Sequence, residues 1–135
     1  MISRKLERYI QILGLIDDSQ DKFLWIMDFG KNSRPMDEAH KVKSFEVPGC
    51  QSQTWLVPHF VEDKIYFTAD SAALISKGMV CMLADVFSGS TSGEIKSFDT
   101  KKLEELQLST LLTPGRNNGV YSMLKKIRGY GQRAA

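Results

Sequence analysis

Two cysteines and two histidines carry most of the nucleophilic and metal-binding chemistry available to this chain of 135 residues. The first cysteine, Cys50, lies in the stretch VPGCQSQ, after a Pro-Gly pair and before small or amide side chains. Pro48 and Gly49 favour a turn, and a turn followed by polar residues is a poor setting for a packed core thiol. We therefore expect either an incidental loop cysteine or a reactive thiol presented by a loop.

A thiol of this kind acts as a nucleophile only in its thiolate form. The ordinary thiol pKa of about 8.5 leaves a few per cent thiolate at neutral pH, so access and local electrostatics control the rate. Gly49 permits a positive φ and a close approach of another backbone. Gln51 and Ser52 can form hydrogen bonds with the loop without competing as nucleophiles.

The other candidate groups lie in less reactive settings. Cys81 falls in the apolar run MVCMLADV, which favours a buried core thiol over a second reactive site. His59 is placed on an expected strand, whose geometry carries it away from Cys50 and argues against a Cys–His hydrolase. His40 is interpreted as a solvated loop residue. The cysteines and histidines lack the spacing of a zinc site, and we find no cofactor-binding motif.

Composition favours one water-soluble domain spanning residues 1–135. The hydrophobic content is 42%, and 18 basic against 16 acidic residues give a net charge of +2, too balanced to indicate nucleic-acid binding. No apolar run approaches the ~18 residues that span a bilayer, so no membrane partner is expected. Two cysteines are too few for a disulfide scaffold of this length. We predict a cytoplasmic protein with reduced thiols.

Hydrophobic periodicity predicts the elements that position Cys50. Helical spacing indicates a first helix over 2–13 and a second that starts at residues 17–19 and ends at Gly30 in a left-handed conformation. The period then changes to two, which predicts an antiparallel meander of strands over 44–47, 54–61 and 65–69. Trp55, on the second of these strands, is expected in the core. Glu62 and Asp63 are expected to form the hairpin turn.

The second half of the chain is predicted to be mainly helical. Asp70 and Ser71 are N-cap candidates for a helix over 72–87, which is hydrophobic nearly all round and therefore buried. Short helical pieces are expected over 92–95 and 100–106. Thr113 and Pro114 predict the start of a last helix, with the tail from 129 fraying. The fold class is α+β, a small three-stranded antiparallel sheet packed against helices.

Three blocks of the sequence, GCQSQTWLV at 49–57, TADSAALISKG at 68–78 and LTPGRNNGV at 112–120, together resemble the SufE family of sulfur-acceptor proteins. The resemblance covers roughly residues 20 to 128. It implies an α+β sandwich shared with IscU-like scaffold proteins of iron–sulfur cluster assembly. It also implies that Cys50 accepts persulfide sulfur from a SufS-type cysteine desulfurase, stimulates that enzyme and passes the sulfur to a cluster scaffold. The PLP cofactor belongs to the desulfurase, and this chain is not itself an enzyme.

The resemblance extends to supporting residues, with two departures. Gly49, Gln51 and Ser52 match the cysteine motif. Arg116 matches a family arginine and is assigned to the site or to partner docking, with a surface arginine as the alternative. Asp70 is kept as a supporting residue, although a helix cap is favoured. Ala72 stands where the family usually has an acid, and Gly115 where it usually has a serine.

Two other functions stay open on the sequence. The domain could be a binding module that activates a desulfurase without covalent chemistry, in which case Cys50 is dispensable. It could also be a cysteine hydrolase, in which case activity depends on His59. By resemblance, the loop holds Cys50 inward at rest and swings it outward on docking. An exposed cysteine loop can also mediate a weak homodimer.

Overall fold

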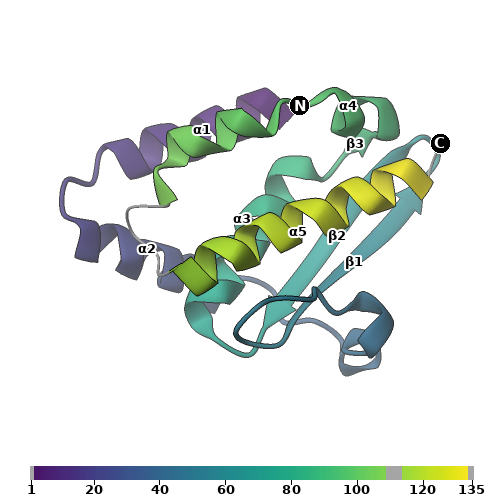
Figure 1. Cartoon of the computed structure of the whole chain (residues 1–135), viewed down its shortest axis with the longest axis horizontal. Coiled ribbons are helices and arrows are strands. Elements are labelled where there is room, and N and C mark those ends of the chain that lie inside the picture. Colours follow the sequence, from purple (N-terminus) through teal and green to yellow (C-terminus); the bar gives the residue numbers. More distant parts are fainter. Residues whose placement is uncertain (1, 109–113, 134–135) are drawn as a thin grey trace.

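The computed structural model describes residues 2–108 and 114–133, with the backbone alone described for 114–117. One antiparallel sheet with the strand order β1-β2-β3 is packed against helices (Figure 1). The strands are Thr54–Val61 (β1), Lys64–Ser71 (β2) and Ser90–Thr91 (β3). The α-helices are Ile2–Gly14 (α1), Ser19–Asn32 (α2), Leu74–Phe87 (α3), Ser92–Ser97 (α4) and Pro114–Arg133 (α5). Three 3₁₀ helices span Glu38–His40 (η1), Lys43–Phe45 (η2) and Thr100–Leu106 (η3).

The α+β class and the three-stranded antiparallel sheet are confirmed, but the third strand is not the predicted one. β1 and β2 pair from Thr54↔Ser71 to Val61↔Lys64, around the predicted two-residue turn. The third strand is β3, which pairs with the start of β2. Residues 43–45 form η2 instead, and only Glu46 bridges to Trp55. Pro48 has no N–H to donate, so the chain turns away before a ladder can form.

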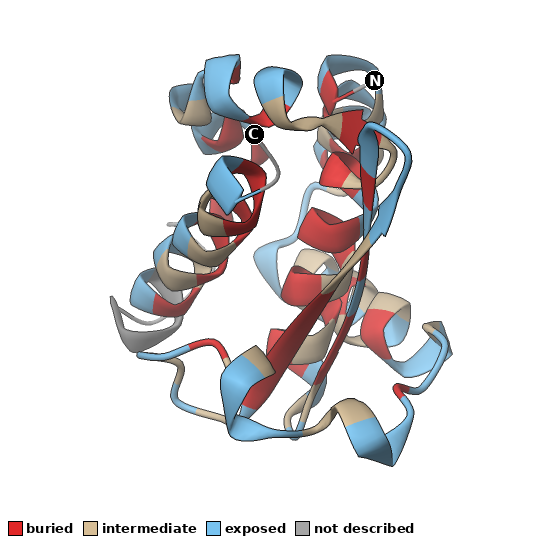
Figure 2. Ribbon diagram, turned by 90° about the vertical axis from the view of Figure 1, so that its right-hand side faces the viewer, coloured by how far each residue is buried: buried red, intermediate tan, exposed pale blue. Residues whose placement is uncertain are grey.

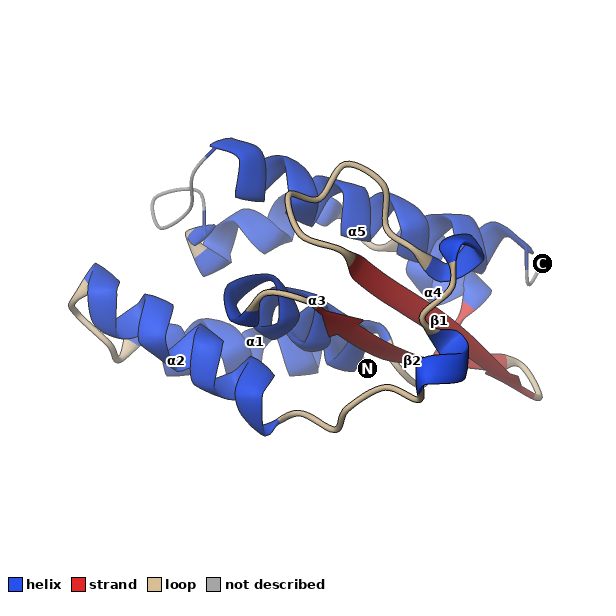
Figure 3. Ribbon diagram, turned by 90° about the horizontal axis from the view of Figure 1, so that it is seen from below, coloured by secondary structure: helices blue, strands red, loops and turns tan. Residues whose placement is uncertain are grey.

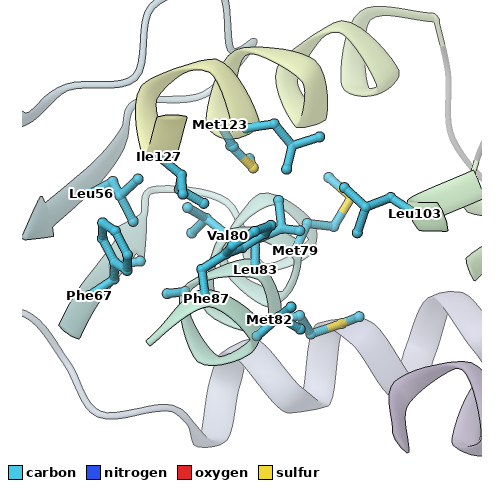
Figure 4. Close-up of a cluster of buried hydrophobic side chains, with 14 of the residues drawn as sticks. Leu56, Phe67, Met79, Val80, Met82, Leu83, Phe87, Leu103, Met123 and Ile127 are labelled. Carbon is cyan, nitrogen blue, oxygen red and sulfur yellow. The ribbon is translucent and has the colours of Figure 1, made fainter. Parts of the chain in front are cut away.

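Helix α3 lies at the centre of the core, as its all-round hydrophobicity predicts. Its side chains meet β2 on one side and α5 on another, and Figure 4 shows Val80, Leu83 and Phe87 between the strands and α5. Figure 2 shows that the buried residues concentrate on α3 and on the faces of β1, β2 and α5 that turn toward it. The core therefore fixes α5 relative to the sheet.

The predicted cap of α3 is wrong. The helix begins after Ala73, which makes no side-chain capping bond, and Asp70 and Ser71 are the last residues of β2. Both residues continue the ladder with β1, so their backbone is committed to the sheet before the helix starts. The cap predicted for α2 is confirmed, since the Asp18 carboxylate accepts a hydrogen bond from the Gln20 N–H at 2.8 Å.

Gly30 does not end α2 in a left-handed conformation, as we predicted. The helix continues to Asn32, and its C-cap, Ser33, is extended. Gly30 is a contact point between helices, because a Cβ there would lie 2.6 Å from the backbone nitrogen of Gly78 in α3. A Cβ on Gly78 would in turn lie 2.7 Å from Cγ2 of Ile26 and closer still to the Ile26 carbonyl oxygen. The two glycines let the α2 and α3 backbones touch.

Helix α5 carries the predicted apolar stripe and is longer than predicted. Met123, Leu124 and Ile127 are buried. The helix runs on to Arg133 without fraying at residue 129, because Tyr130 is buried and its hydroxyl donates to the carbonyl oxygen of Leu56 at 3.0 Å. The predicted cap, Thr113, lies outside the described residues. In the part of the chain that is described, no helix combines the length and apolar character needed to cross a bilayer.

Candidate functional site

The stretch containing Cys50 is a closed loop against α5. The Val47 N–H donates to the Thr54 carbonyl oxygen at 2.7 Å, so the loop begins and ends at one point beside β1. Figure 3 shows it arching from η2 over α5 to the start of β1. Two features of the loop require a glycine at position 49. Its φ is +82°, and a Cβ there would lie 2.9 Å from Oγ of Ser122 on α5.

The Cys50 thiol is half-buried in a niche on α5. Its Sγ lies 3.8 Å from the carbonyl oxygen of Gly119, in the range of a weak thiol hydrogen bond. Gly119 lies directly beside the sulfur, since a Cβ there would be in van der Waals contact with Sγ at 3.4 Å. Burial raises the pKa of the Cys50 thiol, and a hydrogen bond with the Thr54 hydroxyl lowers that pKa only in part. The thiol is therefore protonated and half-shielded at neutral pH.

Thr54 ties the loop to the end of the sheet. Its side chain is fully buried, and Oγ1 lies 3.0 Å from the carbonyl oxygen of Ser52 and 3.0 Å from Oγ of Ser71. The Ser71 hydroxyl also donates to the Gln53 carbonyl oxygen at 2.9 Å. These bonds hold the second half of the loop, whereas the tip contacts α5 through Gly49 and Cys50.

Sequence reasoning did not find Thr54 or Gly119. Gly119 falls inside a predicted helix, and a glycine in a helix interior is a recognisable sign of close packing. Nothing local in the sequence indicates that its neighbour is the cysteine loop, 69 residues earlier. Thr54 is recognisable only as the first residue of a strand.

Asp70 anchors the segment over 36–41 and does not contact Cys50 in the structure. It sits opposite Trp55 in the ladder, on the other face of the sheet from Thr54 and Ser71. Its carboxylate accepts from the backbone N–H of Met36 at 3.2 Å and lies 3.5 Å from Nζ of both Lys41 and Lys77.

Those contacts set the charge of the Asp70 carboxyl. Burial alone would raise its pKa, but hydrogen bonds from the backbone N–H groups of Met36 and Ser71 and the charges of Lys77 and Lys41 lower the pKa overall. The folded pKa therefore lies below the unfolded value of about 3.9. The Asp70 carboxylate therefore stabilises the folded state fully at pH values above its unfolded pKa. This stabilisation is lost as the pH falls through the folded pKa.

Asp70→Asn should therefore destabilise the protein by about 2 kcal/mol at pH 7, because a buried carboxylate with paired donors is lost. The loss should shrink as the pH falls from about 5 toward 2, because wild-type Asp70 becomes protonated there. Urea unfolding at a series of pH values measures both effects. The exposed Asp17→Asn is the matched control. Equal stabilities of wild type and Asp70→Asn at pH 7 would contradict the anchoring assignment.

The structure brings only part of the predicted site together. Ser52 is half-buried beside Thr54, whereas Gln51 is exposed on the loop. The side chain of Arg116 lies outside the described residues, so its assignment stays a prediction. Within the described residues, no three His, Cys, Asp or Glu side chains gather closely enough to hold a metal ion.

Cys81 and the histidines lie at a different site. Cys81 is half-buried, less than the core thiol we predicted, and its Sγ lies 3.6 Å from the Ala69 carbonyl oxygen. It lines a pocket of about 660 Å³ together with His40 and His59. His59 Nε2 is 3.0 Å from Oγ1 of Thr68. The two imidazole rings are 6.1 Å apart, so His40 packs on its neighbours and is not simply solvated. His59 is on the Trp55 face of β1, away from the Cys50 niche.

The fold and this site together define an α+β domain that presents one shielded thiol on a closed loop beside its last helix. The family model for SufE, described as an Fe–S metabolism associated domain, matches residues 7–131. The chain belongs to the SufE family.

Individual relatives agree with this membership. An uncharacterised SufE-like protein of Rhizobium meliloti is 30% identical over 128 residues, which cover 91% of each chain. SufE-like protein 1 of Arabidopsis thaliana, chloroplastic/mitochondrial, is 32% identical over 125 residues. That match covers 92% of this chain and 34% of the plant protein, so this chain spans about a third of that relative.

A solved structure supports the fold. The solution structure of a hypothetical protein from Thermus thermophilus superposes with a TM-score of 0.77 over 96% of this chain and 95% of the other. Its sequence is 14% identical, so the comparison concerns the architecture alone.

Proposed function

We propose that the protein accepts sulfur on Cys50 from the persulfide of a SufS-type cysteine desulfurase and stimulates that enzyme. The observation that carries the proposal is the position of the thiol, half-buried against Gly119 on a loop whose tip meets α5 through a weak thiol hydrogen bond. A carrier needs both properties, since its cargo must be shielded in transit and exposed at each partner. Membership of a family associated with Fe–S metabolism is in keeping with a role in supplying sulfur.

The chemistry is a relative of thiol–disulfide exchange. The Cys50 thiolate attacks the outer sulfur of the donor's persulfide, the donor's S–S bond breaks, and a new S–S bond forms on Cys50. The donor cysteine leaves as a thiolate and takes up a proton. Sulfur moves without net oxidation or reduction, so no external oxidant is needed. The PLP that generates the persulfide belongs to the donor, and the sulfur then passes to a cluster scaffold in the cytoplasm.

The niche on α5 keeps the Cys50 thiol unreactive until the protein docks on its donor. Burial raises the pKa of the Cys50 thiol, so the resting form is a poor nucleophile. When the loop swings outward, the thiol leaves that buried position and its pKa falls toward the ordinary value. Docking thus activates the nucleophile in the same movement that delivers it, without a dedicated base.

Intact mass spectrometry after incubation with a SufS-type desulfurase and free cysteine tests the proposal. We expect a gain of one sulfur atom per chain, removed by dithiothreitol and mapped to the peptide that contains Cys50. Cys50→Ser should show no gain and Cys81→Ser should behave as wild type. Added sulfur that maps to Cys81 would refute the assignment.

A further inference from the structure

A basic groove runs beside the Cys50 loop. It has a volume of about 490 Å³ and lies between Pro48 and Gly49 of the loop and the α5 residues from Ser122 to Arg133. Because Gly49 is part of its wall, a ligand in the groove is next to the residue that precedes the reactive cysteine. The sulfur chemistry itself does not use this groove.

Three cations line the groove, and the described part of the chain gives none of them a carboxylate partner. They are Lys125, Lys126 and Arg133, and none of them forms an ion pair with another described residue. Lys126 Nζ donates to the Ser44 carbonyl oxygen at 3.2 Å. Burial, followed by the nearby charge of Arg133, lowers the pKa of Lys126. Helix α5 itself carries no carboxylate side chain, because Asp and Glu are absent from the sequence after Glu105.

The groove continues onto an apolar patch. Tyr130 and Arg133 also line a second hollow of about 550 Å³, whose other walls are Phe45, Pro58 and Phe60. Phe60 is 54% exposed. Lys126 Nζ and the Arg133 guanidinium lie 5.4 and 5.5 Å from the centre of the Tyr130 ring, so Tyr130 joins the basic and apolar parts.

We infer that this groove binds an acidic segment of the sulfur-donor protein, with carboxylates against Lys125 and Arg133 and an adjacent apolar side chain on Phe60. The inference rests on the proposed function, because it identifies the donor as the occupant. The unpaired cations complement acidic side chains of a peptide, and the exposed phenylalanine complements an apolar side chain next to them. The apolar half and the balanced net charge of +2 disfavour a nucleic-acid backbone as the occupant.

Binding measurements in the Cys50→Ser background test the groove separately from sulfur transfer. The test variant adds Lys125→Glu and Arg133→Glu, two exposed positions, and the probe is a SufS-type desulfurase titrated by calorimetry. The matched control adds Lys101→Glu and Lys102→Glu, which change the net charge equally at exposed positions of η3. We expect the groove variant to bind about tenfold more weakly at low ionic strength and the control to bind as the parent does. The difference should fall in about 0.5 M salt.

The outcomes separate the groove from the carrier function. Equal affinities of groove variant and parent, with Cys50 still loaded in the wild type, overturn the groove alone. A groove-dependent affinity without sulfur on Cys50 supports the groove and refutes the carrier. Equal losses in the control and groove variants, or no binding by the parent, overturn the inference. The inference is also overturned if a single-stranded oligonucleotide binds the groove more tightly than the desulfurase does. A homodimer that depends on the groove residues, seen in ultracentrifugation, would overturn it as well.

Discussion

Cys50→Ala is expected to reduce stimulation of the desulfurase to the unassisted rate and to abolish sulfur transfer. Without the thiol, the donor's persulfide has no acceptor on this protein, and the donor cycle stalls after its first sulfur. The fold should be retained, because Cys50 is only half-buried and its thiol makes a weak hydrogen bond at 3.8 Å to the carbonyl oxygen of Gly119. Cysteine turnover by a SufS-type desulfurase, with and without the variant, measures the effect.

The same measurement separates the carrier from the binding module. Cys81→Ala is the matched control, since Cys81 is also half-buried but lies in the separate pocket lined by His40 and His59. It should stimulate as wild type does. If Cys50→Ala keeps the full stimulation, the domain activates the desulfurase through contact alone and the carrier proposal fails.

Gly78→Ala is expected to cost at least about 3 kcal/mol of stability, or to prevent folding. The added methyl group would collide with backbone and side-chain atoms of Ile26, and neither can retreat because Ile26 is fully buried. Relief requires α2 to move away from α3, which opens the core. A protein of this size has a total stability of about 5–15 kcal/mol, so the loss is a large fraction. Urea unfolding followed by circular dichroism measures it.

Gly129→Ala is the control for Gly78→Ala. Gly129 is also inside a long helix, but nothing lies within 4 Å of a Cβ placed there. Its replacement should stabilise the protein by up to about 1 kcal/mol, through helix propensity. Similar unfolding midpoints for the two variants would show that the α2–α3 contact is looser than described.

The features that could be predicted from the sequence are those determined by residues close together in the chain. Helical spacing identified α1, a nearly continuous apolar run identified α3, and the VPGCQSQ motif identified Cys50. The errors arose where the cause is a partner distant in the chain. Glycine is typical of a helix end, so the sequence predicts that α2 ends at Gly30. Only the contact of Gly30 with Gly78 explains why α2 continues past it.

The prediction of a strand over 44–47 failed for a related reason. Residues 44–47 alternate as a strand does, but alternation does not reveal whether a neighbouring strand is available to pair. The two residues of β3 are too few to show any period. The Cys50 niche was likewise invisible, because it is formed by Gly119 from a separate element.

The closure of the loop limits how far the protein can extend its thiol. Cys50 is three residues from Val47, whose N–H is fixed to Thr54 at 2.7 Å. Three extended residues span about 10 Å, so Cys50 can lie at most roughly 10 Å from Val47 while the anchoring bond holds. If Cys50 collects sulfur as proposed, a donor whose persulfide lies farther than this from Val47 of the docked protein can be served only when the Val47–Thr54 bond opens. The depth of a donor's catalytic chamber then becomes a criterion for which donors this protein can serve.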